Sequence, residues 1–142
     1  MTPNISAINR QRTARVDIAT MRDFAQRALA ACLERPQRKS GCLANLRQVE
    51  VVLVSDKRIA QIHRQFMNEP GATDVITFQH GEIVISVETA KRQARQFGTT
   101  LDHELRLYIV HGLLHLHGFD DTTAGAAAEM KRVQERLVAS LP

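Results

Sequence analysis

The sequence predicts an α+β fold in which a small mixed β-sheet is covered by helices. Four short segments are rich in β-branched residues, and five longer segments place apolar residues at helical spacing. The chain also has no internal repeat and no low-complexity tract. Its 142 residues match the usual size of one domain, so we expect a single domain over residues 1–142.

Two strands and two helices are predicted in the first half of the chain. Weak alternation predicts a strand over residues 5–9, and a run dominated by Val and Leu predicts a buried strand over residues 49–54. Apolar residues at helical spacing predict a helix over residues 17–34 and another over residues 56–68. A polar loop separates the first helix from the second strand.

The second of these helices has a recognisable start. Ser55 or Asp56 is suited to accept a hydrogen bond from the first free N–H groups of the helix. Further along, we expect Ile59, Ile62 and Phe66 to face inward.

A pair of strands follows a turn-rich loop. Residues 75–78 and 82–87 are rich in β-branched residues, and the tight connection at His80 and Gly81 joins them. The second segment is apolar on both faces. We therefore expect a hairpin-like pair in the middle of the sheet.

Three helices complete the chain. The pattern over residues 88–97 predicts an exposed helix that ends at Gly98, and the pattern over residues 123–141 predicts the last helix of the chain. Between them, a strongly apolar helix begins near Thr100 and extends to Leu116. This apolar helix is expected to be central in the fold.

Composition points to a soluble protein with an anionic partner. Lys and Arg outnumber Asp and Glu by 19 to 15, and the pI of 9.6 is compatible with RNA binding. The absence of Trp argues against aromatic stacking as the main means of recognition. Cys32 and Cys42 are expected to be free thiols. Without an apolar leader or an eighteen-residue apolar run, we expect a cytoplasmic protein with no membrane association.

The most informative motif is the run His-Gly-Leu-Leu-His-Leu-His-Gly-Phe-Asp-Asp, which begins at His111. On a helix, His111 and His115 lie one turn apart on the same side and can offer two imidazole nitrogens to one cation. Gly118 can adopt the left-handed conformation that ends a helix, which would bring Asp120 or Asp121 back as a third ligand. Spacing alone leaves a purely structural role for the histidines open.

The donor set suits a zinc-type catalytic site, which keeps three protein ligands and leaves one position for water. Peptidases of the His-Glu-x-x-His type carry their general base directly after the first histidine, and here that residue is Gly112. Peptidase chemistry of that type is therefore disfavoured. His117 lies near the opposite helix face from His111 and is expected to be a surface histidine.

The run resembles the signature of the YbeY-type endoribonucleases, also called rRNA maturation factors, which reads His-Gly-x-Leu-His-Leu-x-Gly-Tyr-Asp-His. Seven positions agree, and Phe119 replaces the tyrosine; the matching residues are His111, Gly112, Leu114, His115, Leu116, Gly118 and Asp120. The segments beginning at Ala72 and Gly81 and the glutamate at Glu104 are also similar to the family pattern. The resemblance covers roughly residues 50–122.

The resemblance implies a metal-dependent, single-strand-specific endoribonuclease that acts in small-subunit rRNA maturation and ribosome quality control. It implies one zinc ion per chain, and RNA and the ribosomal small subunit with its proteins as partners. It places the third ligand on Asp121, where the family carries a histidine. Asp120 then becomes a supporting or turn-capping carboxylate. Glu104 is either a supporting residue or a charge at the helix start.

Two departures from the family pattern bear on activity. Asp121 adds a negative charge to the site, which should raise the pKa of a coordinated water molecule and weaken it as a nucleophile. Met67 stands where the family usually has an arginine. Arg64, one helical turn earlier, is the candidate catalytic cation in its place.

Basic residues on two predicted helices form a candidate RNA-binding rim: Lys57, Arg58 and Arg64 over residues 56–68, and Lys91, Arg92 and Arg95 over residues 88–97. Thr73 and Asp74 either contact RNA or stabilise their turn. A solvated helix face is the alternative for the basic residues. A non-catalytic ribosome-assembly or RNA-binding factor with a degenerate or structural metal site remains a rival function, as does a metal-dependent hydrolase of another substrate. The oligomeric state stays open.

Overall fold

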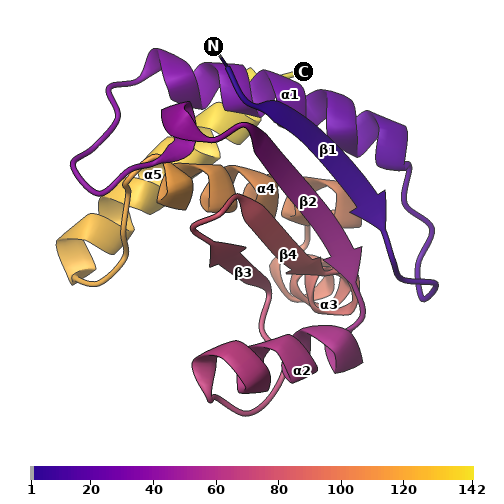
Figure 1. Ribbon diagram of the computed structural model, residues 1–142. Helices are drawn as coiled ribbons and strands as arrows, with labels where there is room; N and C mark the ends of the chain where they lie inside the picture. The colour runs from indigo at the N-terminus through magenta and orange to yellow at the C-terminus, as the bar shows by residue number, and fades with distance from the viewer. Residues whose placement is uncertain (1) are drawn as a thin grey trace.

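The computed structural model describes residues 2–142 and is built around a four-stranded sheet of order β1-β2-β4-β3 (Figure 1). The strands are β1 (Asn4–Asn9), β2 (Gln48–Val54), β3 (Val75–Phe78) and β4 (Glu82–Ser86). β1, β2 and β4 run parallel, whereas β3 pairs antiparallel with β4. The sheet is therefore mixed, and the predicted α+β class is confirmed.

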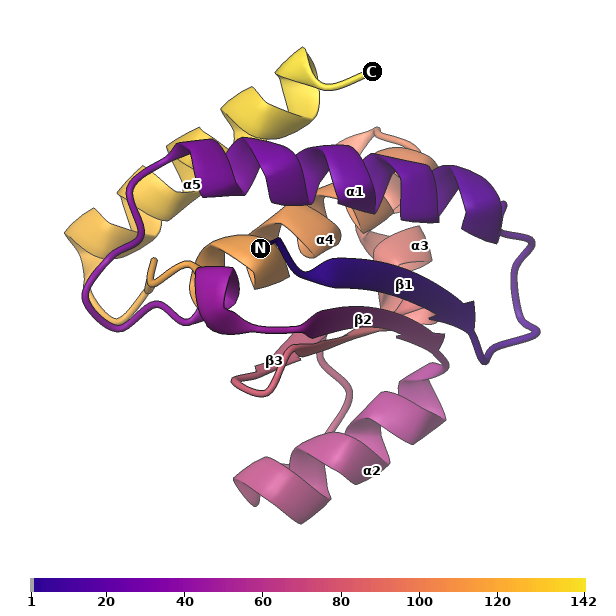
Figure 2. The same ribbon diagram turned by 45° about the horizontal axis from the view of Figure 1, so that its top comes forward.

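Over residues 2–142 the sheet is accompanied by five α-helices: α1 (Ile18–Glu34), α2 (Asp56–Met67), α3 (Val87–Phe97), α4 (Leu101–Leu116) and α5 (Ala124–Ser140). A short 3₁₀ helix, η1 (Leu43–Asn45), which was not predicted from the sequence, precedes β2. Figure 2 shows α1 and α4 over one face of the sheet and α2 on the opposite side. Within the described residues, no helix combines the length and the hydropathy that a membrane-spanning helix requires.

The core is divided by the sheet. Ile83 and Ile85 point into a large apolar cluster with α1, α4 and α5, and Val84 points into a smaller cluster with Ile59 and Ile62 of α2. This alternation follows from the period of two along a strand. The expected inward orientation of Ile59 and Ile62 is confirmed.

Gly112 lets α4 lie very close to the sheet. A Cβ atom built at this position would stand 2.7–2.9 Å from side-chain atoms of Ile83. Only a residue without a side chain fits this contact unless Ile83 moves. The half of α4 that carries both candidate metal histidines is thereby held against β4.

The position of the strand pair differs from the prediction. β4 is central, but β3 is the edge strand, because β4 uses its other side to pair with β2. Val87, which was predicted to belong to the strand, begins α3 because the Ser86 hydroxyl accepts a hydrogen bond from Thr89 N–H at 3.2 Å. α3 is half-buried rather than exposed, with Ala90 and Ala94 packed inward.

The prediction for Phe66 was wrong. Its side chain is 62% exposed, because it lines an open groove between α2 and the sheet. Its ring meets that of Phe78 edge-on, with 5.4 Å between centroids. Ser55 caps α2 as expected, by accepting from Arg58 N–H at 3.2 Å. Cys32 and Cys42 are free thiols, as predicted.

Candidate metal centre

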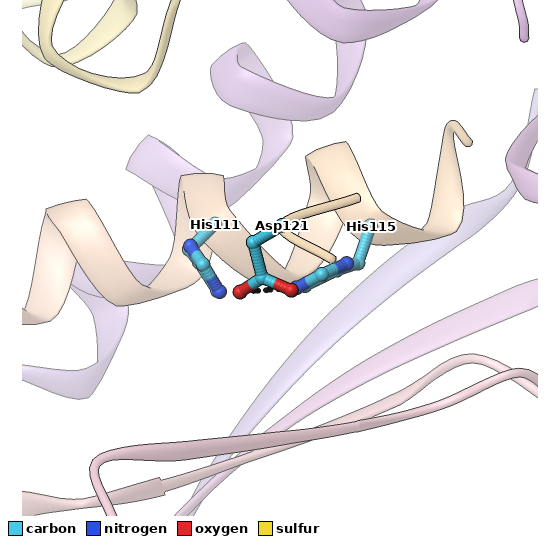
Figure 3. Close-up of side chains that lie close together, drawn as sticks. All are labelled: His111, His115 and Asp121. Atoms are coloured by element: carbon cyan, nitrogen blue, oxygen red, sulfur yellow. Dashed lines mark ion pairs between the residues drawn. The ribbon is translucent and has the colours of Figure 1, made fainter. Parts of the chain in front are cut away.

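The end of α4 brings a carboxylate back to the histidines of the same helix. Gly118 follows the helix with φ of 100°, the left-handed conformation predicted for it. The Phe119 N–H then donates to the carbonyl of Leu114 at 2.9 Å, which closes a tight reversal of the chain. Asp121 thereby returns to the side of α4 from which His111 and His115 project (Figure 3).

His111, His115 and Asp121 form a compact group that could hold a metal ion. One potential ligand atom from each residue lies within 4.8 Å of the other two. His115 Nε2 and Asp121 Oδ2 are 3.8 Å apart, and the two imidazole rings are 4.6 Å apart between centroids. Ligands of a tetrahedral zinc ion stand roughly 3.3 Å apart. A small contraction of the three side chains would therefore suit a single zinc-sized ion.

Hydrogen bonds orient both imidazole rings. His111 Nδ1 lies 2.8 Å from Gln134 Oε1, and His115 Nδ1 lies 3.1 Å from the carbonyl oxygen of Phe119. Both partners are acceptors, so Nδ1 carries the proton in each ring and Nε2 keeps a free lone pair. The two rings therefore present the nitrogen that a metal ion needs.

The electrostatic environment favours a neutral His115. Burial lowers the pKa of this imidazole, and the neighbouring His111 lowers it further, whereas Asp121 acts in the opposite direction. A metal ion binds the neutral ring. The lowered pKa therefore keeps His115 ready for ligation at neutral pH.

The family model described as Endoribonuclease YbeY matches residues 6–142, which is nearly the whole chain. The chain belongs to the YbeY family.

Curated relatives described as Endoribonuclease YbeY, or by a closely similar name, come from several organisms. The protein of Nautilia profundicola is 39% identical over 103 residues, an alignment that covers 67% of this chain and 73% of the relative. The Myxococcus xanthus protein is 36% identical, with 64% of this chain and 35% of the relative covered. Endoribonuclease YBEY, chloroplastic, of Arabidopsis thaliana is 39% identical, with 66% of this chain and 18% of the relative covered. The chain thus spans only a minor part of the two longer relatives.

The fold also has a counterpart among solved structures. The solution structure of TM1509 from Thermotoga maritima superposes with a TM-score of 0.64 at 25% identity, covering 94% of this chain and 86% of that one. The arrangement of sheet and helices is therefore shared with an experimentally determined protein.

Other residues of the YbeY-like pattern line a cleft beside the metal group. Thr73 and Asp74 lie in its wall together with Met67, and its volume is about 350 Å³. The Asp74 carboxylate accepts from Val75 N–H at 2.8 Å, which fixes the loop at the start of β3. Met67, at the position where the YbeY pattern has an arginine, therefore faces the candidate site.

Asp120 and Glu104 lie outside the three-residue group. The Asp120 carboxylate accepts from the hydroxyl and the N–H of Thr122 at 2.8 and 3.1 Å, which lowers its pKa and caps the turn. Glu104 is buried in the first turn of α4 and accepts from the Thr99 hydroxyl at 2.7 Å. Each of these two carboxylates is therefore hydrogen-bonded to a threonine close to it in the sequence.

The basic residues of α2 are all exposed. Lys57, Arg58 and Arg64 lie outside the lining of the cleft beside the metal group, as far as residues 2–142 are concerned. Arg58 instead lines a groove of about 880 Å³ on the α2 side of the sheet. Arg64 lies one turn before Met67 and therefore near the same end of α2.

The prediction of a surface histidine at position 117 was wrong. His117 is 1% exposed, and its Nε2 lies 2.7 Å from the carbonyl oxygen of Arg35. The segment that follows α1 packs against the end of α4, where Arg38 N–H also donates to the His117 carbonyl at 3.0 Å. His117 therefore joins two distant parts of the chain and takes no part in the metal group.

Two residues beside the metal group were not predicted from the sequence. Gln134, on α5, orients His111, and Tyr108 lies three residues before His111 on α4. Gln134 is separated from His111 by 23 residues, so no local spacing indicated their contact. Tyr108 lies within the apolar helix predicted from Thr100 to Leu116, and no motif singled it out.

Proposed function

We propose that this chain is a metal-dependent endoribonuclease that cleaves single-stranded RNA during small-subunit rRNA maturation. The observation that carries the proposal is the convergence of two Nε2 atoms and one carboxylate at a cleft, in a chain of the YbeY family. Two imidazole nitrogens and one carboxylate oxygen are a donor set found in catalytic zinc sites. Zinc, one ion per chain, is therefore the proposed cofactor.

A bound zinc ion would supply a Lewis acid for a phosphate oxygen and lower the pKa of water. The chain itself orients the ligands through Gln134 and the Phe119 carbonyl. Thr73 offers a hydroxyl at the same cleft, and Asp74 lies beside it. We assign these two residues to contacts with the RNA next to the cleaved bond.

We assign Lys57 and Arg58 to the RNA backbone outside the cleft. We assign Arg64 both to the RNA backbone and, as the candidate catalytic cation, to the phosphate at the cleaved bond. All three side chains are exposed on α2, and Lys57 and Arg64 are seven residues apart and so share one side of the helix. The cleft itself has Met67 where an arginine would neutralise charge. Arg64 is the basic residue one turn away.

Cleavage of small-subunit rRNA fragments by the purified protein tests the proposal. Single-stranded fragments should be cut with zinc and left intact with a chelator, and duplex RNA should resist. His115→Ala should lose both zinc binding and cleavage. His103→Ala, which removes an exposed histidine of the same helix, should retain both. Cleavage unchanged in His115→Ala would refute the assignment.

A second candidate is a non-catalytic RNA-binding factor, which the neutral Met67 in the cleft favours. It predicts tight RNA binding without chelator-sensitive cutting. A hydrolase of peptides or small molecules would instead show activity that neither salt nor the loss of Lys57, Arg58 and Arg64 changes.

A further inference from the structure

The metal group lies between two cavities rather than at the end of one. Both cavities include His111, Asp121, Asp74 and Val75 in their walls. The first is the cleft of about 350 Å³, which also contains His115 and several hydroxyl and amide side chains. The second, of about 270 Å³, lies between the start of β3 and helices α4 and α5. We call this second cavity the Tyr108 lobe; its other lining residues are Tyr108, Ala127, Met130, Lys131 and Gln134.

Tyr108, one of the residues that line this lobe, has a buried hydroxyl without a partner among the described residues. Tyr108 is only 7% exposed, and its hydroxyl has no hydrogen-bond partner in the part of the chain that the structure describes. Burial raises the pKa of this phenol, and the carboxylates of Asp74 and Glu104 raise it further, so the hydroxyl keeps its proton. Because buried polar groups are almost always paired, this hydroxyl needs a partner from outside the chain, either water or a bound molecule.

The rest of the lobe is mostly apolar. Val75, Ala127 and Met130 provide apolar walls, and Met130 is buried. Lys131, exposed at the rim, supplies a positive charge. A nucleobase has apolar faces and a polar edge, and it is linked to an anionic phosphate. One nucleotide therefore matches the walls, the hydroxyl and the rim charge together.

We propose that the Tyr108 lobe binds the base of one nucleotide next to the cleaved phosphate. In this arrangement the Tyr108 hydroxyl hydrogen-bonds to the edge of the base, and Lys131 pairs with a backbone phosphate. The inference rests on the proposed endoribonuclease function and gives it a substrate subsite.

The lobe gives a physical reason for a preference for single strands. A base in a duplex is stacked on its neighbours, and its Watson–Crick edge is already paired. Entry into the lobe requires a base that has left the stack, which is far less favourable in a duplex than in a single strand. Flanking bases of an unpaired strand can enter without breaking any base pair.

Methyl NMR of the whole protein in chelator tests this subsite without any need for cleavage. The probes are AMP, CMP, GMP and UMP, with ribose 5-phosphate as the control that lacks a base. At least one nucleotide should shift the methyl signals of Met130 and Ala127, and ribose 5-phosphate should leave them unchanged. Tyr108→Phe should weaken the binding of that nucleotide about two- to tenfold, since one hydrogen bond is lost.

Lys131→Gln should weaken nucleotide binding, whereas Arg22→Gln, which removes an exposed basic residue of α1, should not. If ribose 5-phosphate caused the same methyl shifts as the nucleotides, the subsite would be overturned. Unchanged nucleotide affinity in Tyr108→Phe would also overturn it, because it would mean that water satisfies the Tyr108 hydroxyl. Absence of any shift while the wild type still cuts RNA would refute the subsite and leave the endoribonuclease proposal intact. Nucleotide binding without RNA cleavage would support the subsite and refute the endoribonuclease proposal.

Discussion

Gln134 Oε1 lies 2.8 Å from His111 Nδ1, so a side chain of α5 orients a candidate metal ligand of α4. Such partners of ligating histidines commonly contribute about 10- to 100-fold to metal affinity. Gln134→Leu is expected to weaken zinc binding by a factor in this range, measured by competition with a chromogenic chelator.

The matched control for this substitution is Gln96→Leu, at an exposed position of α3. It should leave zinc affinity unchanged. Equal affinities of wild type and Gln134→Leu would show that the contact with His111 does not support ligation.

Asp121 should limit the cleavage rate at neutral pH. A carboxylate ligand lowers the net charge of a zinc site, so bound water loses its proton less readily than beside three imidazoles. Asp121→His is expected to move the pH–rate profile for RNA cleavage to lower pH. At any pH below the pKa of the bound water, a tenfold more acidic water molecule gives an about tenfold higher rate. An unchanged profile together with full zinc occupancy would argue that Asp121 is not a ligand.

Gly112 should be intolerant of even a methyl group. Gly112→Ala places a Cβ within 2.7–2.9 Å of the buried Ile83 side chain, and overpacking of this kind costs about 1–3 kcal/mol. Gly125→Ala meets nothing within 4 Å in α5 and should be neutral or slightly stabilising. Chemical denaturation of both variants measures the difference. Equal stabilities would contradict the close packing of α4 on β4.

Asp56 joins α2 to α3 and should stabilise the fold in a pH-dependent way. Its carboxylate accepts from the hydroxyls of Ser86 and Thr89 and from Arg92, each at 2.6 Å. Burial alone would raise the pKa of Asp56, but these hydrogen bonds outweigh it and hold the pKa below its ordinary value. Asp56→Asn should therefore cost about 1–3 kcal/mol at neutral pH.

Because the pKa of Asp56 is lowered on folding, its contribution is complete above the unfolded-state pKa of about 4. It disappears as the pH falls through the lowered value. Thermal unfolding of wild type and Asp56→Asn should therefore converge in acid. Asp102→Asn, which breaks a surface ion pair with Arg106, should change stability by less than about 1 kcal/mol. If Asp56→Asn remained less stable than the wild type in strong acid, the stabilisation by Asp56 would not come from its ionised carboxylate.

Local patterns predicted the elements and the metal motif. The Val- and Leu-rich run of β2, the cap at Ser55 and the turn at Gly118 are properties of short segments, so the sequence was sufficient to predict them. The His111 and His115 pair follows from helical spacing in the same way.

Such local patterns could not predict the contacts between segments that are distant in the sequence. His117 is buried because the chain after α1 returns to it, and its partner Arg35 is 82 residues away. β3 is an edge strand because β2 occupies the other side of β4, which depends on the order of pairing. Gln134 reaches His111 only because α5 packs against α4.

Anomalous diffraction at the zinc edge, from crystals grown with zinc, tests the proposed metal centre most directly. We predict one peak per chain about 2.0–2.2 Å from Nε2 of His111, Nε2 of His115 and an oxygen of Asp121, with a further position left for water. Absence of a peak among these three residues in excess zinc would contradict the proposed centre, as would a fourth protein ligand that closes the site.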